Sequence, residues 1–216
     1  MSEKSATVLD GYVIPRIEAS CYCYRFPQFT EWKIANEFQS KRIRLSADVN
    51  QEEIGSVVAK CFRHIKSHQA LSPEKFIEMV INERLDEIAR VRFVGANKLE
   101  TVNGCCSDFW VWRELHLAKE KFVWLGHDPS PELEYNEKEE TVRVWIDSKY
   151  RAKNDEENSI VFSWRDFKKN IRRLNEDLKE FVVLLEAWAE TISPGQAKRL
   201  AEIFEGYLSI NKFERF

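Results

Sequence analysis

The chain has 216 residues, 44% of them apolar and 32% charged, and its 33 basic and 36 acidic side chains leave a net charge of −3. This balance lacks the basic excess of a general nucleic-acid binder, and no run of about eighteen apolar residues is present to span a membrane. Seven Gly and six Pro leave little material for a flexible linker, so we expect one domain over residues 1–216.

The first residues and the cysteines predict where the protein resides. Residues 1–10 are polar and contain no hydrophobic signal core, so we expect a disordered tail here rather than a secretion signal. The cysteines are odd in number and lack the spacing of a secreted disulfide framework: Cys21, Cys23, Cys61, Cys105 and Cys106. Together these features predict a protein of the reducing cytoplasm whose thiols are buried and inert.

Two strands are expected near the N-terminus. Residues 12–26 are rich in β-forming side chains, and Pro15 and Pro27 favour the edge of a sheet, because proline cannot donate to a strand ladder. Residues 43–49 alternate between apolar and polar side chains, which predicts a second strand.

Two helices follow these strands. Asn50 is a suitable N-cap for a helix that continues through Lys66, and Ser72 with Pro73 in the first helical position begins the next. Apolar side chains recur at helical spacing in both segments: Ile54, Val57, Val58, Cys61 and Ile65 in the first, and Phe76, Ile77, Val80, Ile81, Leu85 and Ile88 in the second. These faces are expected to pack into the core.

The middle of the chain contains an ambiguous segment and a hairpin. Residues 109–125 combine strand-favouring aromatic side chains with a stretch that suits a helix, and the pattern does not decide between the two. Residues 133–135 and 141–146 flank a charged turn at 136–140, which predicts a β-hairpin. Residues 149–158 are polar and predict a solvated loop.

A long helix from Ser163 to about Ile192 is the clearest expectation. Ser163 and Asp166 have the spacing of a capping box, and Phe162 and Phe167 have that of a hydrophobic staple. Eight apolar positions alternate in steps of four and three along one seam: Phe167, Ile171, Leu174, Leu178, Phe181, Leu185, Trp188 and Ile192.

Ser193 and Pro194 begin a further helix whose stripe comprises Leu200, Ile203, Phe204 and Tyr207. The two helices are expected to form an antiparallel hairpin over residues 163–210, and an intermolecular coiled coil that joins two copies is the alternative. The elements together predict the α+β class, with a mixed or antiparallel sheet, N-terminal helices and this long C-terminal helical hairpin.

Chemical motifs are sparse. Cys61, His64 and His68 have a spacing compatible with three zinc ligands on one side of a helix, but no Cys-x-x-Cys pair supplies a fourth, and a core cysteine with two surface histidines is the favoured interpretation. The chain contains no phosphate-binding glycine loop and no nucleophile motif. We therefore assign no catalytic residue, metal ligand or cofactor.

Charged side chains gather in three places. Acidic residues surround the expected hairpin and fill the expected loop, where charge runs usually form solvated faces: Glu132, Glu134, Glu137, Glu139, Glu140, Asp155, Glu156 and Glu157. Basic residues occupy the first turns of the long helix, where they oppose the helix dipole: Arg165, Lys168, Lys169, Arg172 and Arg173. We expect the acidic residues 155–157 to neutralise them, with an RNA or phosphate ligand as the alternative.

From Phe109 onward the order of features resembles one group of bacterial polymorphic-toxin immunity proteins. The shared features are an aromatic-Arg-x-Leu segment, a proline turn, a strand that ends in Trp-x-Asp, and a Trp-led helix with regular apolar spacing. Here they are Trp112-Arg113-Glu114-Leu115, Pro129–Pro131, Val144-Trp145-Ile146-Asp147 and Trp164–Leu178. His116 departs from the pattern, which has an acidic residue at this position, and the N-terminal half shows no match.

This resemblance implies a cytoplasmic protein without catalysis of its own, which binds a cognate toxin domain and blocks its active site. Acidic loops and exposed aromatic side chains suit such an interface. The candidate contacts are Trp124, His127 and Asp128 near Gly126, together with Glu137, Glu139, Glu140, Asp155, Glu156 and Glu157. For Trp124, a place in the core is the competing interpretation. Two other functions stay open: a small enzyme that acts on a nucleotide or modified protein through carboxylates, and a helical adaptor or homodimer assembled through the C-terminal helix.

Overall fold

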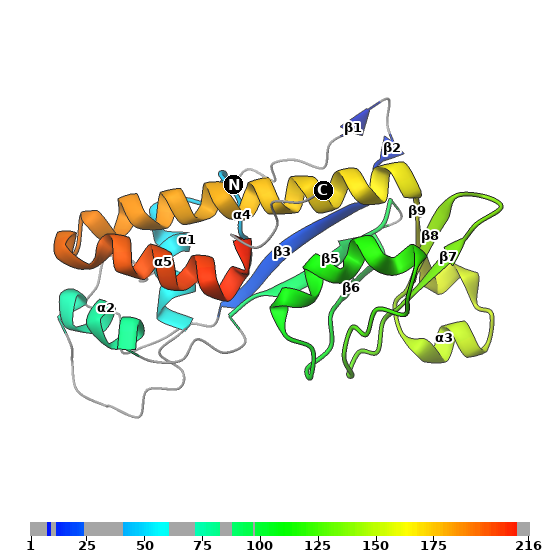
Figure 1. Ribbon diagram of the computed structural model, residues 1–216, viewed down its shortest axis with the longest axis horizontal. Coiled ribbons are helices and arrows are strands. Elements are labelled where there is room, and N and C mark those ends of the chain that lie inside the picture. The colour runs from blue at the N-terminus through cyan, green and yellow to red at the C-terminus, as the bar shows by residue number, and fades with distance from the viewer. Residues whose placement is uncertain are drawn as a thin grey trace. The chain divides into compact units, whose positions relative to one another are not determined.

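The computed structural model describes residues 8–9, 12–23, 41–60, 72–82, 88–96 and 98–210 (Figure 1). The chain divides into two compact units, of which the first comprises 1–18 and 90–174 and the second 19–89 and 175–216. Strand β3 (Arg16–Cys23) and helix α4 (Trp164–Glu190) each continue from the first unit into the second. A single domain over 1–216 stays a prediction. The α+β class is confirmed, since the helices accompany sheets whose described strand pairs are antiparallel.

The first unit contains the predicted hairpin as part of a three-stranded sheet. Strand β7 (Glu132–Asn136) pairs with β8 (Thr141–Trp145) around the turn at 137–140, and β8 pairs in turn with β9 (Ser159–Ser163). Alternation places Leu133, Val142 and Val144 in the core. The sequence interpretation missed β9, because it is short and directly precedes a strong helix start.

A second sheet has the strand order β4-β3-β5-β6, where β4 is Lys41–Arg44, β5 is Arg90–Val94 and β6 is Glu100–Val102. Strand β3 therefore lies inside the sheet, and the expected edge position is wrong. Pro15 precedes the strand, so that β3 itself contains no proline. Strand β4 covers only the first part of 43–49, because residues 46–48 form a turn in which Asp48 N donates to Ser46 Oγ.

Shorter elements decide one open segment and correct two expectations. The ambiguous segment 109–125 begins as a 3-10 helix, η3 (Phe109–Lys119), and ends in residues that belong to neither a helix nor a strand. The expected loop 149–158 contains a short helix, α3 (Ser148–Ala152), and one 3-10 turn, η4 (Glu156–Asn158). Of the expected disordered tail, 1–10, the structure describes Val8–Leu9, which form strand β1 and pair with β2 (Tyr12–Val13).

Helices α1 (Gln51–Lys60) and α2 (Pro73–Asn82) of the second unit begin where the caps predict. Asn50 and Glu53 form a reciprocal capping box, in which Glu53 N donates to Asn50 Oδ1 over 2.9 Å and Asn50 N donates to Glu53 Oε2 over 3.1 Å. Ser72 Oγ accepts from Lys75 N at 3.3 Å. The expected continuation of the first helix through Lys66 lies outside the described residues.

Helix α4 begins with both predicted start signals. Ser163 Oγ accepts from Asp166 N at 3.0 Å and donates to Asp166 Oδ2 at 2.6 Å. The rings of Phe162 and Phe167 meet edge to face with centroids 5.5 Å apart, which completes the hydrophobic staple. The helix ends at Glu190, two residues before the predicted end.

Removal of this cap should lower stability measurably. We expect Ser163→Ala to reduce the free energy of unfolding by about 1 kcal/mol, since the N–H of Asp166 would lose its acceptor. Urea denaturation of the full chain measures the change. Ser163→Asp restores an acceptor oxygen and should recover most of the loss; equal destabilisation by both substitutions would contradict the capping role.

Within the second unit, α4 and α5 (Ala197–Leu208) form the predicted antiparallel hairpin, linked by the 3-10 turn η5 (Pro194–Gln196) (Figure 1). The Phe181 and Phe204 rings lie 6.4 Å apart between the two helices. Seven of the eight seam positions are buried, Ile192 being half-buried beyond the helix end: Phe167, Ile171, Leu174, Leu178, Phe181, Leu185 and Trp188. The seam is therefore covered within one chain. No helix in the described ranges has the length and apolar composition needed to cross a bilayer.

Candidate partner-binding surface

Three predicted contact residues lie together on a turn of the first unit, residues 124–128, which we call the Trp124 turn. Trp124, His127 and Asp128 are all exposed, and the Trp124 and His127 rings meet edge to face at 5.4 Å. Trp124 is 45% exposed, so its competing assignment to the core is wrong. Burial alternates along this segment, with Val123 and Leu125 buried and Phe122 exposed, and Trp124 takes the next exposed position.

Backbone hydrogen bonds hold the Trp124 turn against the segment that follows β6, and two glycines allow this close approach. Gly104 N donates to Leu125 O over 2.5 Å, and Cys105 N donates to His127 O over 2.6 Å. A Cβ at Gly104 would overlap backbone atoms of His127 and Pro129. Gly126 has φ +91°, and a Cβ there would lie 2.9 Å from the Gly104 backbone. The main chains meet closely because neither residue has a side chain.

The predicted acidic contacts, exposed except for the half-buried Asp155, occupy separate places in the first unit. Glu137, Glu139 and Glu140 lie in the turn between β7 and β8, while Glu156 and Glu157 lie in η4 and Asp155 directly before it. No hydrogen bond, ion pair or ring contact between described residues joins either acidic group to the Trp124 turn. Of the predicted contacts, the structure thus brings together those of the Trp124 turn, and the acidic residues stay separate candidates.

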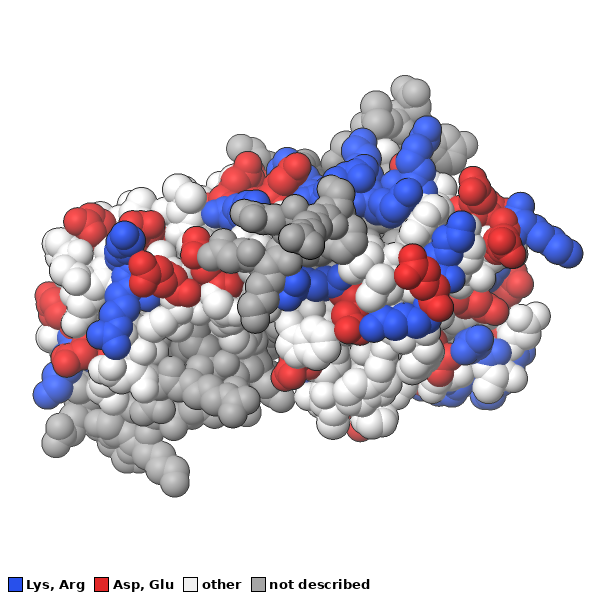
Figure 2. Space-filling model, in the orientation of Figure 1, with Lys and Arg blue, Asp and Glu red and all other residues white. Residues whose placement is uncertain are grey.

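The first turns of α4 present a basic face. Arg165, Lys168, Lys169 and Arg172 are exposed at positions i, i+3, i+4 and i+7, which places them on one side of the helix. In Figure 2, Lys and Arg side chains gather over this part of α4.

The expected neutralisation of this face by residues 155–157 is wrong. Glu156 pairs with Arg143 at 3.4 Å, and Asp155 accepts from Asn158 at 2.9 Å. Within the described part of the chain, none of Arg165, Lys168, Lys169 and Arg172 forms an ion pair with a carboxylate. The face is therefore a second surface that suits an anionic partner.

The basic face should carry a measurable stability cost. We expect Arg165→Glu to raise the free energy of unfolding by about 1 kcal/mol, because an acidic side chain in the first turn complements the helix dipole and can pair with Lys168 and Lys169. Urea denaturation at low salt measures the gain. The gain should shrink in about 1 M NaCl, where the Debye length is about 3 Å. Lys153→Glu, at the C-cap of the short helix α3, is the control, because an acid at a helix C-terminus opposes the dipole. An equal gain there would refute the dipole argument.

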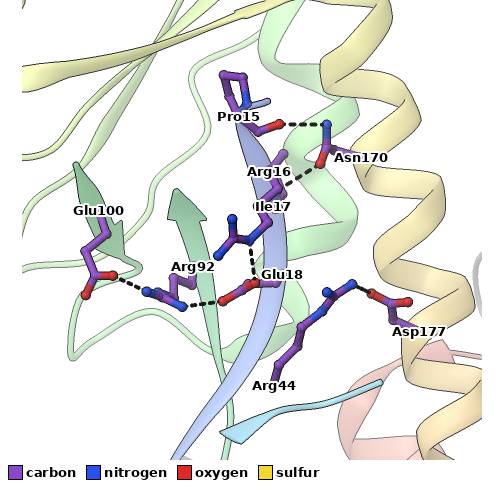
Figure 3. A network of polar contacts seen from close by, with 9 residues as sticks. All are labelled: Pro15, Arg16, Ile17, Glu18, Arg44, Arg92, Glu100, Asn170 and Asp177. Atoms are coloured by element: carbon purple, nitrogen blue, oxygen red, sulfur yellow. Dashed lines mark hydrogen bonds and ion pairs between the residues drawn. The ribbon is translucent and has the colours of Figure 1, made fainter. Parts of the chain in front are cut away.

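A buried charge network that the sequence interpretation missed lies at the start of β3 (Figure 3). Glu18 is 3% exposed, and its carboxylate accepts from Arg16 Nε at 3.0 Å and from Arg92 Nη1 at 2.5 Å. Arg92 also pairs with Glu100. Burial alone would lower the pKa of Arg92, but the hydrogen bond to Glu100 and the charge of Glu18 raise it above its ordinary value. Both carboxylate oxygens of Glu18 are engaged, which indicates a structural role.

Three further polar contacts in Figure 3 fix helix α4, two in the first unit and one in the second. In the first unit, Asn170 Oδ1 accepts from Ile17 N at 3.0 Å, and its Nδ2 donates to Pro15 O at 3.4 Å. In the second unit, buried Asp177 pairs with Arg44 at 2.5 Å. No periodicity predicts these pairs, since their partners are far apart in the sequence.

The described cysteines form two close pairs. Cys21 and Cys23 are buried on β3 with their sulfurs 3.2 Å apart. Burial alone would raise the pKa of the Cys21 thiol, but the hydrogen bond from Cys23 and the nearby Lys60 charge lower it. Cys105 and Cys106 are exposed with their sulfurs 3.5 Å apart, so the expectation of buried thiols is wrong for this pair. They lie in the turn after β6, which directs both side chains outwards.

The remaining chemical candidates are limited. Cys61, His64 and His68 lie outside the described residues, and the described ranges contain no group of three or more His, Cys, Asp or Glu placed to hold a metal ion. An open surface hollow of about 550 Å³ is lined by Glu132, Ser148, Lys149, Arg151 and Ala152. Its carboxylate, Glu132, accepts from Arg151 at 2.7 Å. That ion pair engages the one acid among the described residues that line the hollow.

Comparison with protein-family models, with curated proteins and with solved structures found no match to this chain. Any functional assignment therefore depends on the chain's own residues and surfaces.

Proposed function

We propose that the protein is an immunity protein, which binds a cognate antibacterial toxin domain in the cytoplasm and blocks its active site. The Trp124 turn is the observation that carries this proposal. It presents an aromatic side chain, an imidazole and a carboxylate on the surface, and backbone contacts to Gly104 and Cys105 hold them in place.

The composition and rigidity of the Trp124 turn suit tight protein recognition. Trp124 is 45% exposed, and Trp is among the residues that supply most of the energy in protein interfaces. The backbone hydrogen bonds at 2.5 and 2.6 Å restrict the turn before binding, which reduces the conformational entropy lost on association. The resemblance of the segments around Trp112, Trp145 and Trp164 to immunity proteins is consistent with this role.

Coexpression with the neighbouring toxin tests the proposal. The gene is expected to lie immediately downstream of a large toxin gene. The C-terminal domain of that toxin, when expressed alone, should kill cells, and coexpression of this chain should restore growth. The two proteins should also co-purify in stoichiometric amounts. Killing that coexpression does not relieve, with no co-purification, would overturn the proposal.

A substitution locates the interface. We expect Trp124→Ala to raise the Kd for the toxin domain about 30-fold, which corresponds to about 2 kcal/mol for a central aromatic contact. Isothermal titration calorimetry with both purified proteins measures this effect. Val183→Ala is the matched control, because Val183 is 67% exposed and apolar but belongs to α4 in the second unit. An unchanged Kd for Trp124→Ala, with circular dichroism unchanged, would exclude the Trp124 turn from the interface.

A further inference from the structure

Cys105 and Cys106 form an exposed vicinal dithiol beside the Trp124 turn. Their sulfurs lie 3.5 Å apart, and both side chains are exposed. The Cys105 amide is one of the two donors that hold the turn, since it bonds to His127 O at 2.6 Å. The neighbouring Gly104 amide is the other, with Leu125 O as its acceptor. An exposed pair of thiols and a structural anchor thus share one short stretch of backbone.

We propose that Cys105 and Cys106 are a reversible dithiol–disulfide site that controls the anchor of the Trp124 turn. The oxidant is a low-molecular-weight disulfide such as glutathione disulfide. One cysteine thiolate attacks the small disulfide and releases one thiolate leaving group. The second cysteine thiolate then attacks the mixed disulfide, forms the Cys105–Cys106 bond and releases the second thiol. The protein loses two protons and two electrons, and the small disulfide takes up these protons and electrons to become two thiols.

Ring closure between adjacent residues must change the local backbone. Consecutive Cα atoms are about 3.8 Å apart, whereas disulfide-linked residues normally have Cα atoms at least about 4.4 Å apart. The turn must therefore twist to bring the sulfurs from 3.5 Å to bonding distance. The amide nitrogen of Cys105 is bonded to a Cα atom that belongs to the disulfide ring. This twist therefore turns the Cys105 N–H away from His127 O. Oxidation weakens the anchor, and reduction restores it.

The experiment uses the full chain with Cys61→Ser, because Cys61 lies outside the described residues, whereas Cys21 and Cys23 are buried. The folded protein is incubated with glutathione disulfide, acid-quenched, alkylated and mapped by mass spectrometry. We expect the peptide that contains Cys105 and Cys106 to lose two hydrogens and to carry neither an alkyl group nor glutathione. The Cys106→Ser variant should instead acquire one glutathione. A wild-type pair that stops at glutathione adducts would overturn the proposal.

Amide hydrogen exchange tests the link to the anchor. In the oxidised protein, the amides of Gly104 and Cys105 should exchange about tenfold faster, as expected for the loss of one backbone hydrogen bond, and dithiothreitol should restore slow exchange. The Cys105→Ser/Cys106→Ser variant, treated identically, should show no change. Disulfide formation with unchanged exchange at both amides would refute control of the turn. Neither readout requires the toxin partner, so the result is independent of the proposed immunity function.

Discussion

Leu178→Asp is expected to unfold the protein rather than to dissociate an oligomer. Leu178 is fully buried on the seam of α4, one helical turn from Phe181, which packs against Phe204 of α5. The substitution removes a buried apolar side chain and places a carboxylate in its site. We expect a loss of at least about 4 kcal/mol, which is a large part of the stability of an ordinary domain.

Circular dichroism in urea and size-exclusion chromatography with light scattering separate the two outcomes. Val183→Asp is the control, because Val183 lies on the same helix and is 67% exposed. It should leave both the unfolding midpoint and the mass unchanged. A wild-type dimer that Leu178→Asp converts into a folded monomer would contradict the intramolecular packing and revive the homodimer alternative.

The C-terminal half was predictable because its signals are local. The capping box at Ser163, the staple and the seam all act within one helix, and each appears in the structure. The hairpin of β7 and β8 follows equally from two short alternating segments and a charged turn. Such patterns involve residues a few positions apart, where the sequence itself fixes the spatial relation.

The errors concern contacts between distant segments. The interior position of β3 depends on the β5 strand, about seventy residues away in the sequence, which periodicity cannot place. The sequence predicts ion pairs between the basic residues of α4 and the nearest acidic run. In the structure, Glu156 of that run pairs with Arg143 of β8 instead. For the candidate surface, sequence reasoning identified Trp124, His127 and Asp128 but missed Gly104. A glycine carries no local sign that another main chain will pass beside it.

Gly104→Ala is the strongest test of how the candidate surface is built. The added methyl group would overlap the backbone N and O of His127 and the backbone O of Pro129. Backbone cannot move aside by a change of rotamer, so the Trp124 turn must separate from the segment after β6. We expect the substitution to cost about 3 kcal/mol or more in unfolding free energy, since overpacking against side chains alone typically costs about 1–3 kcal/mol.

Gly206→Ala provides a control of opposite sign. Among the described residues, no atom outside the adjacent residues and the backbone of α5 lies within 4 Å of a Cβ at Gly206. Alanine there should therefore stabilise the protein by about 0.5–1 kcal/mol through helix propensity. Urea denaturation compares both variants with the wild type. If Gly104→Ala left the unfolding free energy and the hydrogen exchange of the Cys105 amide unchanged, the close approach of the two backbone segments would not be what holds the turn. If instead the variant folds with weaker toxin binding, the glycine contact sets the geometry that the partner recognises, because Trp124 itself would be unchanged.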